Sequence, residues 1–519
     1  MNKKLLCALL ALSCHHVVMH ADVYGRTFLT LRQRFEINLP ERMNMFRERM
    51  DDRKDGKGGA FQFVGFYGQT TNAADIARYF SPNDKDYIII GEDTSSVSIN
   101  RTRDINAFHL GILTSPLDTE AINTGFTHLT FESVLTFCPQ QKTYGLGVTY
   151  QQRLPNHFWL DVSAPIIAVK NNMNPTEHIL NAGGEDVPTG YFGNALAALS
   201  PCNTDLHYGH ITNRTLKKTR LAFIELRGGR DIIWEGPCRI GGFLGLLIPT
   251  GNKPCGYYLF EPIVGNNQHF EAMIGSYGNF EVMRDKDDRT LNALYNITTR
   301  YLFSNDQIRS FDLRGKPWSR YMKVWKNSNY GQEVSTDDWQ SHLDYLINYS
   351  TLCAQIKPSA AFDISVGLNY KQKNLMLEFG YNAYARKAED IYFTHAINGD
   401  VGLPALEYYL ETSHVPYTDS KATPATPLFK ISSGYSDQVI NPSGSAQVPA
   451  YIPITTDDLD PYSASHPACL AYLVYGAIGY NWPELKFPLF VNGGISYEFS
   501  HDNTYIKRWL AWLKIGFSI

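Results

Sequence analysis

The sequence predicts an all-β fold: an antiparallel transmembrane β-barrel of about 14 strands, within a range of roughly 12 to 16, because single-chain barrels have even strand numbers. Three observations predict it. Long segments alternate between apolar and polar residues. No run of about 18 apolar residues, as a spanning helix needs, follows the N-terminus. The 519-residue chain contains 32 Tyr and 28 Phe, which suit strand surfaces and aromatic girdles.

The hairpin expected over Ala360–Arg386 shows the alternation most clearly. Its first arm places apolar residues such as Phe362 and Ile364 at every second position, and the second arm resumes with Leu375 and Leu377 after a tight turn. Each arm has about ten residues, the length that a tilted strand needs to cross a bilayer. One apolar face and one charged face suit a barrel with lipid outside and water inside.

The N-terminal segment Met1–Ala21 is typical of a cleaved secretory signal peptide. Lys3 and Lys4 supply the charged start, and Leu5–Ser13 supplies the apolar run. Two alternatives are a buried N-terminal helix and a lipid anchor at Cys14, although the residues before Cys14 match a lipoprotein signal poorly. Export predicts the bacterial outer membrane as the location of the barrel.

Export also permits disulfide bonds. The mature chain would keep six cysteines, and the sequence leaves free thiols and bridges equally open. These cysteines are Cys138, Cys202, Cys238, Cys255, Cys353 and Cys469.

Residues 22–106 are expected to hold an N-terminal strand and a plug or loop segment. The strand is predicted at Gly25–Asn38, a second candidate strand at Ala60–Gly68, and a short helix at Thr71–Tyr79. A plug inside the barrel is slightly favoured over a loop for residues 40–105.

Residues 107–519 are predicted to form the barrel, with one long irregular tract at Lys387–His466 that suits a barrel rim. Besides the hairpin, the expected strands are Ala107–Leu113, Phe126–Phe137, Tyr144–Arg153, Phe158–Ile166, Thr219–Gly228, Arg239–Ile248, His269–Val282, Leu291–Phe303, Trp318–Trp325, Cys469–Tyr480, Pro488–Phe499 and Tyr505–Ile519.

Three short segments resemble parts of bacterial outer-membrane proteins. The final strand ends with Ile515, Phe517 and Ile519 at alternate positions, which resembles the C-terminal signal for barrel assembly, although that signal usually ends in Phe or Trp. Gly242–Pro254 (GFLGLLIPTGNKP) and Phe260–Asn267 (FEPIVGNN) resemble strand-loop elements of outer-membrane transporters and porin-like proteins, including a type that takes up aromatic compounds. The wider pattern resembles an uncharacterised barrel group of host-associated bacteria. The resemblance implies no functional residues.

Charged and polar side chains on the inward faces are the candidate functional residues. We expect some of them to line a water-filled lumen and to select solutes, as charged rings do in channels. The alternative is a closed interior in which they satisfy one another. The candidates are Glu132, Arg153, Glu225, Arg227, Arg300, Asp363, Asn369, Glu378 and Arg386.

Enzyme signatures are missing from the sequence. It contains no G-x-S-x-G, H-E-x-x-H or P-loop motif, and no Cys/His spacing typical of zinc. The acidic run Asp457–Asp460 could hold calcium, but such a run more often lies in a solvated loop. The net charge of −4 includes no basic excess for binding nucleic acid. No catalytic residue, metal or cofactor is therefore expected.

Three functions remain open from the sequence. The first is a passive channel for small solutes, and the second is a closed barrel whose loops bind a host surface or another protein. The third is a barrel enzyme acting on lipid or peptide. The expected partners are outer-membrane lipid, small solutes, a host surface, and the barrel-assembly machinery through Phe517 and Ile519.

Overall fold

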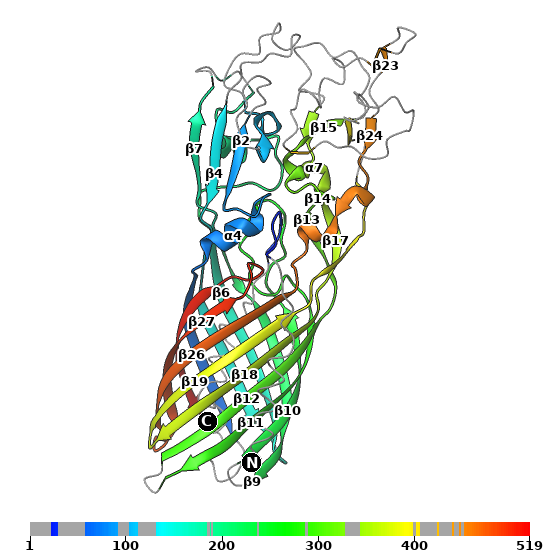
Figure 1. Cartoon of the computed structure of the whole chain (residues 1–519). Coiled ribbons are helices and arrows are strands. Elements are labelled where there is room, and N and C mark those ends of the chain that lie inside the picture. The colour runs from blue at the N-terminus through cyan, green and yellow to red at the C-terminus, as the bar shows by residue number, and fades with distance from the viewer. Residues whose placement is uncertain are drawn as a thin grey trace.

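The computed structural model consists of a barrel and a folded cap above it (Figure 1). It describes residues 22–29, 58–91, 103–112, 131–183, 187, 190–235, 238–285, 289–326, 343–397, 401–404, 423–424, 439–440, 446–447 and 451–519.

Twelve antiparallel strands close into the barrel, in the order β5-β1-β28-β27-β26-β19-β18-β12-β11-β10-β9-β6, with β6 pairing back to β5. A further strand, β8 (Leu216–Leu221), pairs with β6 outside the closed wall. The predicted all-β antiparallel barrel is confirmed, and its 12 strands lie within the predicted range of 12 to 16, although the preferred count of 14 is too high. The wall strands are β1 (Gly59–Thr70), β5 (Gln140–Arg153), β6 (Phe158–Asn172), β9 (Phe223–Glu235), β10 (Cys238–Pro249), β11 (Glu271–Arg284), β12 (Arg289–Leu302), β18 (Ser359–Gln372), β19 (Leu375–Arg386), β26 (Cys469–Trp482), β27 (Leu489–Ser500) and β28 (Arg508–Ser518).

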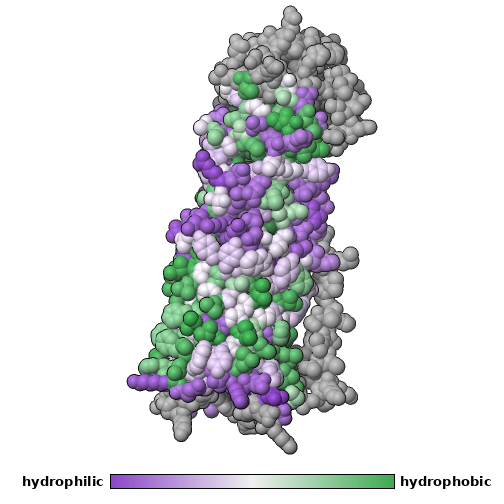
Figure 2. All heavy atoms as spheres, turned by 90° about the vertical axis from the view of Figure 1, so that its left-hand side faces the viewer, coloured by the Kyte–Doolittle hydropathy of each residue, from purple (hydrophilic) through white to green (hydrophobic). Residues whose placement is uncertain are grey.

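Each wall strand has one inward and one outward face, as the alternation predicts. In β28, Leu513 points outward with 56% of its surface exposed, whereas its neighbour Lys514 points inward with 0% exposed. Figure 2 shows the result on one face of the molecule, where hydrophobic side chains cover the lower part of the barrel below a hydrophilic band. The exposed outward side chains, which we call the hydrophobic belt, include Leu146, Leu160, Ile166, Leu244, Ile274, Leu368, Phe379, Ile478, Ile495 and Leu513.

The ends of the chain close the barrel. β1 pairs with β28 along its length, with Phe61 opposite Phe517, and with β5 on its other side. The backbone N–H of Gly59 donates to the carbonyl of Ile519, and the N–H of Ile519 donates back to Gly59. The hairpin expected over Ala360–Arg386 is confirmed as β18 and β19, with Tyr370 opposite Leu377.

The two ends of the barrel differ in their connections. At the lower end, short turns join β5 to β6, β9 to β10, β11 to β12, β18 to β19 and β26 to β27. At the upper end, the connections from β1 to β5, β6 to β9, β12 to β18 and β19 to β26 carry further strands and helices, which form the cap (Figure 1). In bacterial outer-membrane barrels the short turns lie on the periplasmic side and the longer loops on the opposite side.

The cap contains several small sheets and short helices. One sheet joins β3 (Ile105–Asn106), β2 (Tyr87–Gly91), β4 (Glu132–Phe137) and β7 (Pro175–Asn181). The other strands are β13 (Asn305–Ser310), β17 (Thr351–Lys357) and β20 (Asp390–Phe393); β16 (Leu343–Tyr345), β15 (Lys323–Lys326), β21 (Val401–Pro404) and β24 (Tyr451–Pro453); β14 (Asp312–Leu313) and β25 (Leu459–Asp460); and β22 (Val439–Ile440) and β23 (Ala446–Gln447). The helices are α4 (Ala73–Phe80), η1 (Ala107–Leu110), α6 (Ala195–Ala198), η2 (Ser319–Tyr321), α7 (Ile347–Ser350), η5 (Thr456–Asp458) and η6 (Pro461–Ala464).

Two hydrophobic cores hold the cap together. In one, the fully buried Trp318 packs on Tyr321 and donates its indole N–H to the carbonyl of Phe80 at 2.6 Å. The other gathers buried residues such as Phe311 and Val324. The cap is therefore a packed structure with its own cores rather than a set of separate loops.

Three predicted strands lie in the cap rather than in the wall. Phe126–Phe137 contributes β4, and its residues 126–130 lie outside the described part. Trp318–Trp325 divides into η2 and β15, and Ala107–Leu113 contains η1 instead of a strand. β4 was predicted as a wall strand because a cap sheet with one buried face produces the same alternation as a barrel wall.

The N-terminal predictions have mixed outcomes. Ala60–Gly68 is confirmed as a strand and belongs to β1, so the barrel wall begins well before residue 107. The described part of Gly25–Asn38, residues 25–29, is not a strand, and its remainder lies outside the described residues, as does Met1–Ala21. The described part of the 40–105 segment belongs to the wall and cap, so the plug is not confirmed. The helix predicted at Thr71–Tyr79 is confirmed as α4.

Candidate functional site: the barrel interior

Five charged side chains on the inner wall form what we call the upper charge cluster: Asp161, Glu225, Arg227, Glu271 and Arg300. Arg227 donates to Asp161 at 2.8 Å and lies 3.4 Å from Glu225. Arg300 lies 3.1 Å from Glu225 and 3.8 Å from Glu271. The strands of Arg300 and Glu225 are separated by β10 and β11, so the curvature of the wall brings these two side chains together inside the lumen. All five are buried.

A second group near the lower end, the lower charge cluster, centres on Asp231. Arg239 donates to both carboxylate oxygens of Asp231, at 3.1 and 3.0 Å, and Arg153 lies 3.7 Å away. The hydroxyl of Tyr277 donates to Asp231 at 2.6 Å and accepts from the indole N–H of Trp159 at 2.8 Å. Aromatic rings therefore screen one side of this buried carboxylate.

The β18–β19 hairpin places its predicted candidates in two hydrogen-bonded pairs. The amide of Asn369 donates to Glu378 at 3.1 Å, and Tyr475 donates to the same carboxylate at 3.3 Å. Higher in the wall, Asn382 donates to Asp363 at 2.8 Å. In this part of the interior, neutral amide and hydroxyl groups therefore donate hydrogen bonds to the carboxylates.

On the wall formed by β5, β1 and β27, several buried polar atoms have no hydrogen-bond partner among the described residues. They are both amide atoms of Gln62, Oε1 of Gln151, Nδ2 of Asn492 and Oγ of Ser496. An unsatisfied buried polar group costs about 1–3 kcal/mol. This side of the lumen is therefore a surface that needs polar contacts from inside the barrel.

Arg386 lies at the top of the wall, where barrel and cap meet. It pairs at 2.8 Å with Glu389, which also lies 3.5 Å from Arg309 and accepts from the backbone N–H of His466. Burial alone would raise the pKa of Glu389, but the positive charges of Arg309 and Arg386 outweigh it and bring this pKa to about 2. Burial lowers the pKa of His466 to about 3. The junction thus joins cap to barrel through a buried carboxylate between two guanidinium groups.

Glu132 is the one predicted candidate outside the barrel. It begins β4 in the cap, opposite Asn181, so its expected role in lining the lumen is wrong. The sequence list also omitted four charged residues of the two clusters, one of which is Arg239, the first residue of a predicted strand. Asp161 lies on the polar face that the alternation identifies, and Glu271 lies within a predicted strand, whereas Asp231 follows Gly228, where the predicted strand ended.

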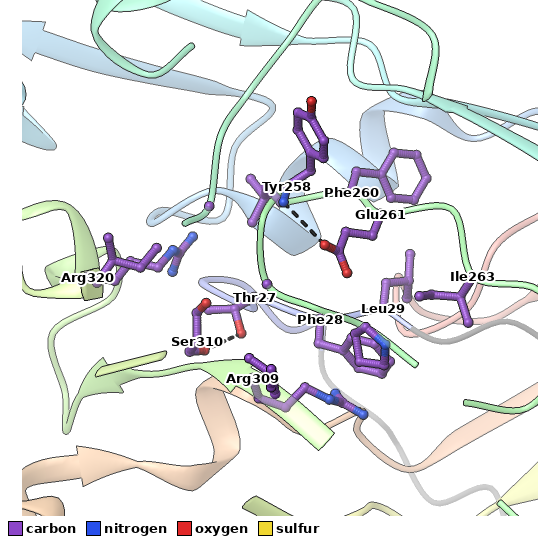
Figure 3. A pocket seen from close by; sticks show the side chains of 16 residues that line it. Thr27, Phe28, Leu29, Tyr258, Phe260, Glu261, Ile263, Arg309, Ser310 and Arg320 are labelled. Atoms are coloured by element: carbon purple, nitrogen blue, oxygen red, sulfur yellow. Dashed lines mark hydrogen bonds between the residues drawn. The ribbon is translucent and has the colours of Figure 1, made fainter. Parts of the chain in front are cut away.

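A small cavity of about 30 Å³ lies within the cap, between residues 27–29 and the loop that contains Glu261 (Figure 3). Thr27 donates to the carbonyl of Ser310 at 2.6 Å, and the backbone N–H of Tyr258 donates to Glu261 at 3.4 Å. The cavity has room for about one water molecule, so it is too small for a larger ligand.

Other site types find little support in the described part of the chain. No group of three or more His, Cys, Asp or Glu side chains could hold a metal ion there, and all six cysteines are free. None of the described helices has both the length and the apolar character required to cross a membrane.

No family model and no curated protein matches the chain. Several solved bacterial outer-membrane barrels are similar in fold. An outer-membrane channel from Pseudomonas putida F1 is 8% identical, with 90% of this chain and 99% of that chain covered and a TM-score of 0.35. The transport unit of the autotransporter AIDA-I from Escherichia coli is 8% identical (93% and 97% covered, TM-score 0.31), and a FadL homologue from Pseudomonas aeruginosa is 9% identical (89% of each chain, TM-score 0.26). At these values no residue role transfers to this chain.

Proposed function

We propose that this chain is a bacterial outer-membrane β-barrel that passes small polar solutes through a narrow lumen. The observation that carries the proposal is the polar inner surface, which extends from the lower charge cluster through the upper charge cluster to Arg386 at the cap. A barrel that served only as an anchor could fill its interior with apolar side chains at lower cost, because buried charges carry a desolvation penalty.

The apolar outer face of the barrel supports insertion into a membrane. Removing the exposed belt from water would stabilise the protein by about 25 cal/mol for each Å² of apolar surface. The belt and the hydrophilic bands that border it match the expected arrangement of lipid and headgroups (Figure 2). Phe517 and Ile519, at the end of β28, are the residues through which we expect recognition by the assembly machinery.

The lumen is hydrated in this proposal. Gln62, Asn492 and Ser496 have polar atoms that need partners, and water is the simplest partner inside a polar cavity. The inward side chains are nevertheless almost fully buried, so the passage is narrow. We expect a small conductance and exclusion of bulky solutes.

Cysteine substitution in planar bilayers tests the proposal. Ser496 points inward with 3% of its surface exposed, and the adjacent Ile495 points outward with 58% exposed. A charged, water-soluble thiol reagent should reduce the stepwise conductance of Ser496→Cys several-fold and leave Ile495→Cys unchanged. The wild-type chain, with its own six cysteines, gives the baseline for the reagent. Folded protein that never conducts would contradict the proposal.

A second candidate function, binding of a host or partner surface, is supported by β7. This strand is the outer strand of its cap sheet, and its Ile179 and Leu180 are both exposed. Exposed apolar residues on an edge strand favour pairing with another protein. Replacing both by Asn should abolish adhesion of expressing cells to host cells while conductance stays unchanged. Unchanged adhesion would remove this candidate.

A further inference from the structure

Three lysines lie side by side on the outer face of the barrel near its upper edge. Lys142 of β5 is opposite Lys170 of β6, and Lys170 is opposite Lys217 of β8. Leu146 and Ile166, which are four positions from Lys142 and Lys170 along their strands, are exposed outward residues of the hydrophobic belt. Because side chains alternate between faces, all five side chains lie on the same outer surface. We call the three lysines the lysine row.

An aromatic residue separates the lysine row from the belt. Tyr144 lies two residues from Lys142, and Lys170 Nζ lies 5.2 Å from the centre of its ring. Tyr67 of β1 is opposite Tyr144 on the same surface. Tyrosines at this level are typical of the boundary between acyl chains and headgroups.

The lysine row is electrostatically unfavourable by itself. Like charges at directly opposite positions of paired strands destabilise a sheet. Among the described residues, no acidic side chain pairs with Lys142, Lys170 or Lys217. Neighbouring strands are about 4.8 Å apart, so the row extends over roughly 10 Å. A bound anion that contacts several ammonium groups would remove this repulsion.

We propose that the lysine row binds the phosphorylated headgroup of an anionic lipid of the outer leaflet, whose acyl chains lie on Leu146 and Ile166. A lipid fits this surface better than a soluble phosphate because exposed apolar side chains begin only four positions below the lysines on the same face. The inference rests on the membrane location in the proposed function but not on solute passage. Lipid binding on the outer face of β5, β6 and β8 does not depend on the residues of the inner wall.

Lipid binding can be measured on the full-length protein in neutral detergent by native mass spectrometry. The probes are diphosphorylated lipid A, phosphatidylglycerol and phosphatidylcholine. The wild-type chain should retain the two anionic lipids in preference to phosphatidylcholine. Each lysine near an anionic headgroup strengthens binding by roughly fivefold, so the triple variant K142Q/K170Q/K217Q should bind on the order of a hundredfold more weakly.

A matched variant removes the same charge elsewhere. K373Q/K387Q/K486Q takes three lysines from separate places, two of them in turns at the lower end, and should bind like the wild type. Equal retention by both triple variants would overturn the proposal. Competition by millimolar inorganic phosphate as strong as that by anionic lipid would overturn the lipid assignment. Conductance of the lysine-row variant is measured separately, so loss of lipid binding with conductance intact separates this inference from the channel function.

Discussion

Replacing Asp231 by Asn tests whether the lower charge cluster is a buried ion-pair network. The change keeps the size of the side chain but removes the charge that Arg239 contacts through two nitrogens and that Arg153 approaches at 3.7 Å. It also weakens the 2.6 Å hydrogen bond from Tyr277. Removing one partner of a buried pair typically costs about 3–5 kcal/mol, because the other charge stays buried. We expect a loss of that size in the free energy of unfolding.

The control is Glu281→Gln, which breaks an exposed pair. Arg284 contacts both carboxylate oxygens of Glu281, at 2.9 and 2.6 Å, with 55% of the arginine side chain exposed. An exposed pair is worth about 0–1 kcal/mol. Denaturant unfolding in lipid vesicles, followed by tryptophan fluorescence, measures both variants. If Asp231→Asn costs no more than Glu281→Gln, water screens the lower charge cluster and the buried network is refuted.

Two further predictions concern the wall and the junction. A Cβ at Gly494 would lie 2.1 Å from the Trp512 ring, so Gly494→Ala should cost about 1–3 kcal/mol in the same unfolding assay, whereas Gly493→Ala, with its nearest atom at 3.5 Å, should be nearly neutral; equal losses would contradict this packing. The junction should weaken on acidification. Below about pH 6.5 the unfolded chain binds a proton at His466 that the folded chain does not bind until its pKa of about 3, so the folded state loses stability as the pH falls over this range. The stabilisation from Glu389 is lost in addition as the pH falls from about 4.5 to its folded pKa of about 2. As the pH falls, the amide protection factors of η6 and β20, which are corrected for intrinsic exchange, should decrease. The variant His466→Gln should lose the part of this decrease that lies above about pH 4.5. Protection factors that do not change with pH would refute the linkage.

The two-faced strands were predictable because alternation depends only on local sequence. β18, β19 and β28 needed no knowledge of their neighbours, and their inward residues, such as Glu378 and Lys514, follow from position along the strand. The same local signal misplaced Glu132, since β4 alternates for a cap sheet and not for the wall. A two-residue alternation shows that a strand has one apolar face, but it does not show whether that face is buried in the cap or exposed on the barrel wall.

The charge clusters could not be predicted from the sequence because they depend on the curvature of the barrel wall and on the stagger of its strands. Arg300 meets Glu225 across two intervening strands, and no spacing along the chain encodes that contact. Asp231 was missed because Gly228 and Gly229 interrupt the alternation, although the strand continues to Glu235. The local pattern was therefore enough to predict the strands, whereas the contacts within the charge clusters depend on how distant strands are arranged in space.

A spin-label scan of β27 from Val491 to Glu498 in lipid vesicles tests the central claim most directly. Labels at outward positions such as Ile495 should relax with dissolved oxygen, which concentrates in hydrocarbon, and labels at Asn492 and Ser496 should relax with a water-soluble nickel complex. The two accessibilities should alternate with a period of two residues and in opposite phase. Inward labels that the nickel complex never reaches, or outward labels without enhanced oxygen contact, would contradict a barrel with lipid outside and water within.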